Sequence, residues 1–144
     1  MTFWDSSAIL PLLLEEPATS EMRRLAQTHG PPAVWWGTLV ECSSALARRS
    51  RLAEFPPSEK RRATDRLMEM AAIWTEIQPG EVLRGRSLRL LSSHNLRAAD
   101  ALQLAAALIW AEERPAGRSF ICLDERLRQA ARRDGFTVLP EDSL

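Results

Sequence analysis

The sequence predicts an α/β fold, a three-layer α/β/α sandwich with a central parallel sheet, in a single domain over residues 1–144. Short apolar runs of strand length alternate with longer runs of helical periodicity, which is the pattern of a parallel sheet covered by helices on both faces. The length of 144 residues and the apolar content of 45% suit one domain that buries about 70% of the surface of its unfolded chain. No repeat, low-complexity segment or linker interrupts the chain.

The first half of the chain is expected to supply two strands and four helices. They are a strand over 3–5, helices over 6–16 and 18–29, a strand over 33–36, and helices over 39–51 and 58–72. We expect Ser6 or Ser7 to cap the first helix and Ser58 to cap the fourth, because hydroxyls accept hydrogen bonds from the first turn. Pro11 should leave the first helix short or bent. On the fourth helix, Met68 is expected to contact the core.

The second half is expected to supply three strands and three helices. They are a strand over 73–77, helices over 81–91 and 97–113, a strand over 119–123, a helix over 125–133 and a strand over 136–139. The helix over 97–113 is apolar on nearly every side, which predicts that it is buried all round. Only Asp100 and Gln103 interrupt its middle, three residues apart and on one face. Gly135 suits the left-handed end of the following helix.

The composition narrows the class of protein and its compartment. Lysine plus arginine and aspartate plus glutamate both number 19, so the net charge gives no reason to favour or exclude a nucleic-acid partner. Cys42 and Cys122 have no Cys or His nearby at metal-ligand spacing, so we expect reduced core thiols and no zinc site. No apolar run approaches the ~20 residues of a membrane span, and no signal peptide is recognisable. We therefore expect a cytoplasmic protein that does not contact a membrane.

Four acids occupy comparable places in successive strand–helix units. Asp5 and Asp124 directly follow apolar strands, and Glu41 and Asp100 lie in the first turns of helices. Each alone could be a helix cap or a partner of the helix dipole. In parallel sheets, however, ligands bind outside the carboxyl ends of the strands, where these residues should meet.

A shared acidic pocket has a chemical consequence. Two carboxylates ~4 Å apart repel by about 4 kcal/mol at an effective dielectric near 20, so four together would take up protons or bind cations. Hard oxygen ligands in this number suit Mg²⁺ or Mn²⁺ rather than zinc. One or two such ions can activate water and stabilise the leaving oxygen in phosphodiester hydrolysis.

The segments that carry these acids resemble the PIN-domain ribonucleases, and most of all the VapC toxins of bacterial and archaeal toxin–antitoxin pairs. The resemblance rests on Glu41 and on the segments 5–10, 96–101 and 120–127, and it covers essentially the whole chain. It implies a PIN-like fold and Mg²⁺- or Mn²⁺-dependent endonuclease action on RNA. It also implies a homodimer and a cognate antitoxin protein that blocks the site.

The resemblance also assigns residues. Asp5, Glu41, Asp100 and Asp124 match the acidic quartet of the family, which is both catalytic and metal-binding. As a hypothesis, Asp5 and Asp100 are the principal metal ligands, while Glu41 and Asp124 hold water on the ion or a second ion. Ser6 matches a polar position that helps to hold the metal or its water.

Other residues near these positions have more open interpretations. Arg97 could contact a phosphate of the substrate or lie in solvent at a helix end. The basic run at 48–51 could guide RNA, meet an acidic antitoxin segment or be a solvated face. Cys122 departs from the family, which often has Thr or Ser two residues before the last acid, so a hydroxyl contact there is in doubt. His94 has no partner pattern in the sequence that suggests acid–base catalysis, and we expect it in a loop.

Two alternative functions remain open at this point. The first is another Mg²⁺-dependent phosphohydrolase. Phosphatases similar to haloacid dehalogenases need Asp-x-Asp, but position 7 is serine, and they use a lysine near the site, whereas Lys60 is the only lysine. The second is a non-catalytic PIN-like module that binds RNA or protein, against which the intact quartet argues.

Overall fold

A computed structural model describes residues 1–52 and 55–141. The strands are β1 (Phe3–Trp4), β2 (Ala33–Trp35), β3 (Thr75–Ile77), β4 (Ser119–Ile121) and β5 (Thr137–Leu139). The helices are α1 (Ser6–Leu13), α2 (Thr19–His29), α3 (Thr38–Arg51), α4 (Pro57–Ala71), α5 (Glu81–Ser93), α6 (Ala98–Trp110) and α7 (Glu125–Arg133).

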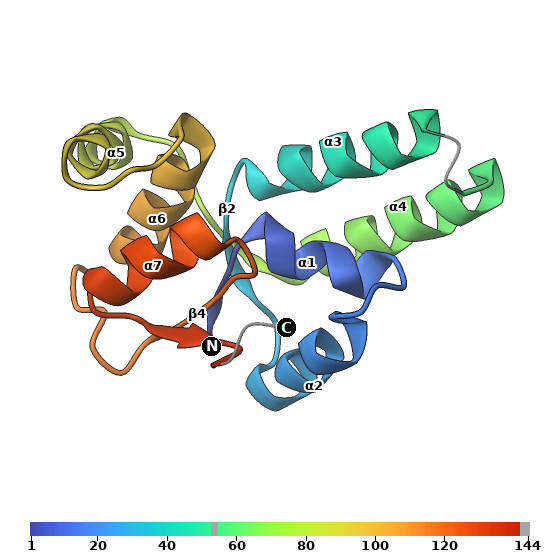
Figure 1. Ribbon diagram of the computed structural model, residues 1–144, viewed down its shortest axis with the longest axis horizontal. Coiled ribbons are helices and arrows are strands. Elements are labelled where there is room, and N and C mark those ends of the chain that lie inside the picture. The colour runs from blue at the N-terminus through green and yellow to red at the C-terminus, as the bar shows by residue number, and fades with distance from the viewer. Residues whose placement is uncertain (53–54, 142–144) are drawn as a thin grey trace.

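The strands form one five-stranded sheet in the order β3-β2-β1-β4-β5, and every pair is parallel. Side chains alternate across this sheet, as the pleat requires. Phe3 packs in the core beneath α5, α6 and α7, whereas its neighbour Trp4 packs in the core beneath α1 to α4. Figure 1 shows these two helical groups on opposite sides of the strands. The predicted three-layer α/β/α sandwich with a central parallel sheet is therefore confirmed.

The strand order creates a crevice at one place on the sheet. The chain builds β1, β2 and β3 outward in one direction, then crosses back over α5 and α6 to add β4 on the other side of β1. Such a reversal between two neighbouring strands leaves an opening at their carboxyl ends, where α/β proteins bind ligands. Asp5 and Asp124 follow these two strands, β1 and β4.

Helix α6 is buried for most of its length, as predicted. Its buried side chains include Gln103 and the continuous run from Leu104 to Leu108. It packs against α5 and against β2. The helix ends at Trp110 rather than at the predicted position 113, because Glu112 and Glu113 adopt left-handed backbone angles (φ 55° and 59°) that end the helical ladder.

The predicted N-caps were wrong at two helices. Asp5, not Ser6 or Ser7, caps α1, because its carboxylate accepts the Ser7 backbone N–H at 3.1 Å. Helix α4 begins at Pro57 rather than after Ser58, since proline has no N–H to satisfy and its fixed φ suits a first helical position.

Three other expectations needed smaller corrections. Helix α1 is short, as predicted for a helix that contains Pro11, but it ends at Leu13. The side chain of Met68 is 54% exposed and makes no core contact of the predicted kind, because it lies one position beyond Leu67 on the solvent side of α4. Strand β3 begins at Thr75, since Ile73 is exposed in the turn before it.

No helix in the described ranges is both long and apolar enough to span a membrane.

Candidate active site

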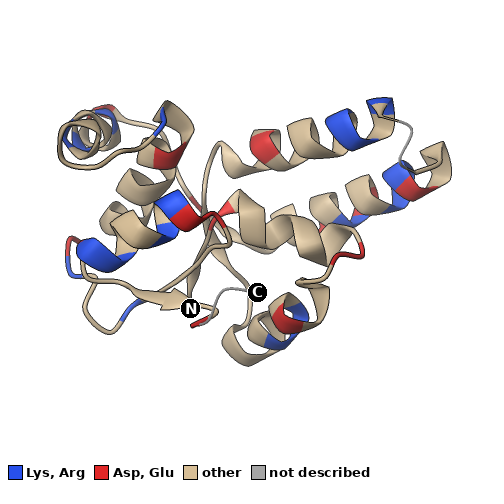
Figure 2. Cartoon of the chain, in the orientation of Figure 1, with Lys and Arg blue, Asp and Glu red and all other residues tan. Residues whose placement is uncertain are grey.

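The four predicted acids lie around one cavity. Asp5, Glu41, Asp100 and Asp124 all line a space of about 460 Å³, together with the serines Ser6, Ser7 and Ser44, with Arg48 and with the apolar side chains Leu10, Val40 and Ala45. They come from four elements that are far apart in sequence. Figure 2 shows acidic segments (red) on α3 and α6 and near the starts of α1 and α7, around the middle of the molecule. The structure therefore brings together all four residues that the sequence singled out.

Asp5 is the most buried member of the group, with only 4% of its surface exposed. Its Oδ2 accepts the Ser7 N–H at 3.1 Å, and the Cys122 thiol lies 3.7 Å from the same oxygen. Burial raises the pKa of Asp5, and the charges of Asp100 and Asp124 add to the rise, while the hydrogen bonds from Ser7 oppose it. The Asp5 carboxylate is thus held in place, but its hydrogen bonds only partly offset the cost of burying its negative charge.

Glu41 projects from the first turn of α3 and is half-buried. Its Oε1 accepts a hydrogen bond from Gln103 Nε2 at 2.9 Å, and its Oε2 accepts one from Ser6 Oγ at 3.3 Å. Burial raises the pKa of Glu41 to about 7, with a further contribution from the charge of Asp5, although both hydrogen bonds lower it. A carboxyl with this pKa exchanges protons near neutral pH.

Asp100 and Asp124 lie nearer to solvent. Asp100 Oδ2 faces the backbone N–H of Arg97 at 3.5 Å, and Asp124 Oδ1 accepts the N–H of Leu127 at 3.2 Å. Burial raises the pKa of Asp100, and the charge of Asp124 adds to it, while Arg126 and Arg97 act against the rise. Asp5 and Asp124 bond to the first turn of the helix that follows each of them, and Asp100 bonds back to the N-cap residue of its own helix. The capping role and the site position therefore coexist in the same residues.

The four carboxylates suit a divalent cation that keeps several of its own waters better than an ion whose ligands all come from the protein. Within residues 1–52 and 55–141, no group of three or more His, Cys, Asp and Glu side chains is arranged to hold a metal ion. Mg²⁺ keeps several of its waters and usually takes only one or two carboxylates, so it does not need such a group. The raised pKa values of Asp5, Glu41 and Asp100 mark uncompensated negative charge that a cation would relieve.

Cys122 does not replace the missing hydroxyl as a ligand. The thiol is fully buried, and burial raises its pKa well above the ordinary value, so it stays protonated at neutral pH. The hydroxyl near this position belongs to Ser7 instead. Ser7 Oγ accepts the backbone N–H of Leu123 at 2.9 Å and lies 3.7 Å from the Cys122 sulfur. Ser7 thereby joins the start of α1 to the turn that carries Asp124.

Two further residues that support the site were not identified as such from the sequence. Gln103 donates to Thr38 Oγ1 at 3.0 Å as well as to Glu41, so it orients Glu41 from inside α6. Arg128 is buried and donates to the carbonyls of Cys122 at 2.7 Å and Pro140 at 2.6 Å, which joins the ends of β4 and β5. Arg128 lies on the apolar stripe of α7, three residues before Ala131. This position was the feature of the sequence that could have indicated a buried arginine.

Arginines border the acidic cavity on its open side. Arg48, Arg97 and Arg126 line an adjoining space of about 600 Å³ together with the acids Glu41, Asp100, Asp124 and Glu125 and with Ala99. The basic run at 48–51 is divided, because Arg49 forms an ion pair with Glu16. Arg97 thus lies beside the site, where a phosphate of a substrate could reach it.

His94 lies in the segment after α5, outside any helix or strand, as predicted, but the sequence did not indicate its partner. His94 does have a partner, since its Nε2 lies 3.0 Å from Asp134 Oδ1, and only 7% of its side chain is exposed. The two residues are 40 positions apart, so no local pattern could indicate the pair. His94 lines neither of the two cavities that contain the acids.

Comparison with known proteins identifies similar folds. No protein-family model matches the chain, and no curated protein sequence matches it. A toxin–antitoxin complex from Klebsiella pneumoniae contains a chain that is 14% identical, with a TM-score of 0.69 and coverage of 100% of both chains. FitAcB from Neisseria gonorrhoeae is also 14% identical, with a TM-score of 0.67 and coverage of 98% of both chains. At this level of identity, the likeness concerns the fold.

Proposed function

We propose that this protein is a metal-dependent endoribonuclease that hydrolyses RNA phosphodiester bonds and acts as the toxin of a type II toxin–antitoxin system. The observation that carries the proposal is the convergence of Asp5, Glu41, Asp100 and Asp124 on one cavity at the carboxyl ends of β1 and β4. The arginines that border this cavity and the resemblance to VapC-like PIN domains support RNA as the substrate.

Each acid has a part in the proposed reaction. Asp5 and Asp100 would hold Mg²⁺ or Mn²⁺, with Glu41 and Asp124 completing the site. When bound, the ion would supply the positive charge that activates a water and stabilises the leaving oxygen. Asp5 is fixed for this task by the Ser7 N–H, and Glu41 is oriented by Gln103.

The substrate would be held by polar side chains around the acids. Ser6, whose hydroxyl donates to Glu41, would contact the scissile phosphate or the water beside it. Arg97 would bind a phosphate from the rim of the adjoining space, where its guanidinium can offer two parallel donors. These contacts would orient the RNA backbone across the carboxylates and offset their negative charge.

The proposal extends to the protein partners. One of the structural neighbours is a toxin–antitoxin complex from Klebsiella pneumoniae, which supports a cognate antitoxin for this chain. We also propose a homodimer in the cytoplasm, as the family resemblance implies. The apolar character of α1 and α6 gives no separate argument for that dimer, because most of their apolar side chains pack in the chain's own core.

A non-catalytic PIN-like module that binds RNA or protein is the second candidate. One observation favours it: the described residues contain no group of three acidic, His or Cys side chains already arranged around a metal position. Such a module would bind RNA through the same arginines and would not cleave it. Another Mg²⁺-dependent phosphohydrolase is a weaker alternative, because Lys60, the only lysine, lines neither cavity that contains the acids.

Cleavage assays on purified protein test the proposal. We expect endonucleolytic cleavage of RNA with Mg²⁺ or Mn²⁺ and none with a chelator. Asp5→Asn and Asp100→Asn should each reduce the rate at least about 100-fold, because losing a direct ligand of the ion should cost no less than the roughly 10–100-fold lost with an outer-shell partner. Asp65→Asn is the matched control, because Asp65 is an exposed acid on α4 that lines neither cavity.

Two results would count against this assignment. Cleavage that persists in both Asp5→Asn and Asp100→Asn at the rate of the control would refute the roles of these residues. RNA binding without cleavage under any divalent cation would favour the non-catalytic module.

A further inference from the structure

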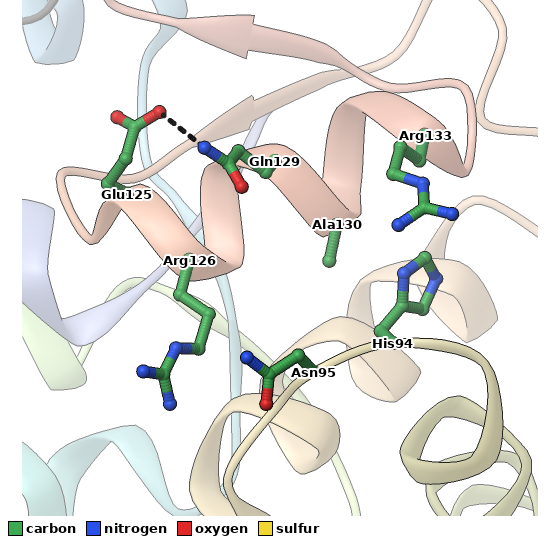
Figure 3. A pocket seen from close by; sticks show the side chains of 7 residues that line it. All are labelled: His94, Asn95, Glu125, Arg126, Gln129, Ala130 and Arg133. Carbon is green, nitrogen blue, oxygen red and sulfur yellow. Dashed lines mark hydrogen bonds between the residues drawn. The ribbon is translucent and has the colours of Figure 1, made fainter.

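We propose that a cavity beside the acidic site binds the nucleotide that flanks the scissile phosphate in a single-stranded RNA. The inference rests on the proposed ribonuclease function and adds a recognition site to it. This flanking cavity has a volume of about 400 Å³ and lies between α7 and the segment that joins α5 to α6 (Figure 3). Its lining consists of His94, Asn95, Glu125, Arg126, Gln129, Ala130 and Arg133.

The flanking cavity neighbours the space that adjoins the acidic site. Glu125 and Arg126 line it and also line the 600 Å³ space that contains Asp100 and Asp124. Arg126 is close enough to Asp100 for its charge to act against the rise in the pKa of that acid. An RNA strand whose phosphate lies at the carboxylates would therefore pass Arg126 and place its next nucleotide in the flanking cavity.

The cationic side chains of this cavity are available to a ligand. Arg126 and Arg133 lie seven residues apart on α7, two turns along one face, with Gln129 between them. Neither arginine forms an ion pair or a hydrogen bond within the part of the chain that the structure describes. Glu125 is the only acid in the lining, and it is already engaged by Arg128 at 3.6 Å and by Gln129 at 3.4 Å.

The two walls of the cavity are fixed relative to each other. His94 and Asn95 follow α5, and Asp134 follows α7. The 3.0 Å contact between His94 Nε2 and Asp134 Oδ1 ties these segments together, and His94 is almost fully buried. A cavity held in this way loses little conformational freedom when a ligand binds.

The chemistry of the lining favours a nucleotide over an apolar ligand or a duplex. Ala130 is the only apolar residue, and guanidinium groups both bind phosphate with two parallel hydrogen bonds and stack on bases. The amide of Asn95 can exchange a donor and an acceptor with a base edge, which is accessible only when the base is unpaired. The volume lies at the small end of ligand sites and suits one nucleotide.

The first test measures RNA binding without cleavage. The full chain carrying Asp5→Asn would be titrated, without divalent cations, against a fluorescein-labelled single-stranded hexaribonucleotide, and anisotropy would report the affinity. Arg133→Gln should weaken binding about five-fold, as expected for one lost phosphate contact, and should reduce the slope of log K against log salt by about 0.7.

Arg132→Gln is the matched control, because Arg132 is the preceding residue of the same last turn, is exposed, and does not line the cavity. It removes the same charge from the same helix. We expect it to change the affinity less than two-fold.

The second test measures sequence preference in the otherwise unchanged enzyme. Asn95→Ala should flatten the base preference at one position beside the cleavage site, as read by sequencing the product ends of a randomised RNA. Cleavage at sites that carry the preferred base should slow, while cleavage at the other sites should stay the same, because only the preferred base loses a contact. A general folding defect would instead slow cleavage at every site equally.

The outcomes separate this inference from the proposed function. If Arg133→Gln binds RNA as tightly as Arg132→Gln, or if Asn95→Ala leaves the cleavage pattern unchanged, the flanking site is refuted while the nuclease stands. If RNA binds with the Arg133 dependence but is never cleaved, the nuclease fails and the RNA site stands. If an Asp/Glu-rich peptide binds with that dependence and the hexaribonucleotide does not, the cavity belongs to a protein partner and the inference is overturned.

Discussion

At the scale of single residues, Glu41 is a candidate catalytic residue whose ionisation lowers the stability of the folded protein. Its carboxyl is partly buried beside Asp5 and accepts hydrogen bonds from Gln103 and Ser6. The pKa of about 7 therefore lies above the ordinary value of 4.5. Because the folded state holds its proton more tightly than the unfolded state, ionisation of Glu41 destabilises the metal-free protein as the pH rises from about 4.5 through 7.

Glu41→Gln should remove this pH-dependent loss. We expect the variant to unfold at a temperature roughly 3 °C higher than the natural chain at pH 7.5 in a chelator, a figure reduced for the partial exposure of the carboxyl. At pH 4.5 the two proteins should unfold at the same temperature, because the natural carboxyl is then protonated in the folded state. Thermal unfolding by circular dichroism across this range checks the prediction, and a difference that stays constant with pH would contradict it.

At the scale of secondary-structure elements, the start of α7 shows how one residue serves both the fold and the site. Asp124 accepts the Leu127 N–H as the N-cap of α7 and also lines the acidic cavity. The turn that carries it is held from behind by Arg128, which bonds to the carbonyl of Cys122, and from the side by Ser7, which accepts the Leu123 N–H. The position of this carboxylate therefore depends on α1, α7 and β4 together.

Two substitutions of Asp124 should separate its roles. Asparagine can still accept the Leu127 N–H, so Asp124→Asn should keep the stability within about 0.5 kcal/mol, while Asp124→Ala should lose about 1 kcal/mol. Both should lose most of the RNA cleavage, because both lack the carboxylate. Urea unfolding and cleavage assays on the same preparations provide the two measurements. Equal stability of the two variants would show that the cap does not stabilise α7.

At the scale of the whole molecule, the placement of four acids on separate elements predicts that a divalent cation stabilises the folded state. Their carboxylates come from α3, α6 and the turns after β1 and β4, so a cation that binds them would bridge both helical layers. A ligand that binds only the folded state stabilises it by mass action.

Mg²⁺ should therefore raise the unfolding temperature of the natural chain. At ten times the dissociation constant the gain is about 1.4 kcal/mol, or roughly 4 °C for a domain of this size. The gain should be larger at pH 7.5 than at pH 5, because protonated carboxyls do not bind the ion. Differential scanning fluorimetry at matched ionic strength measures it, with Asp65→Asn as the control that keeps the shift. An equal shift in the Asp5→Asn, Asp100→Asn double variant would show that the ion binds elsewhere.

Much of the architecture was predictable because it follows from local patterns. The alternation of apolar strands and amphipathic helices indicated the parallel sheet, and α7 was predicted over the residues that the structure gives it. The errors fell where two local rules compete. At the start of α1, Asp5 and two serines could all cap the helix, and at α4 a proline and a serine both suited its first turn.

The supporting residues of the candidate site could not be predicted in the same way. Gln103 reaches Glu41 across 62 positions and Ser7 reaches Leu123 across 116 positions. Such contacts depend on how the chain returns to the sheet through its crossovers. Glutamine and serine at those positions are equally compatible with solvent-exposed roles when only the sequence is considered.

The sequence by itself determined the chemical candidates: it places carboxylates directly after strands and in the first turns of helices, because apolar periodicity and capping are local properties of the chain. Only the tertiary structure decided that these acids share one cavity, that Arg126 lines both the space adjoining that cavity and the flanking cavity, and that His94 has Asp134 as its partner. The physical reason is the strand order β3-β2-β1-β4-β5, which sets β1 beside β4 although the register partners Trp4 and Ile121 lie 117 positions apart in the sequence. That adjacency arises from long-range packing of two hydrophobic layers, which no short window of residues encodes.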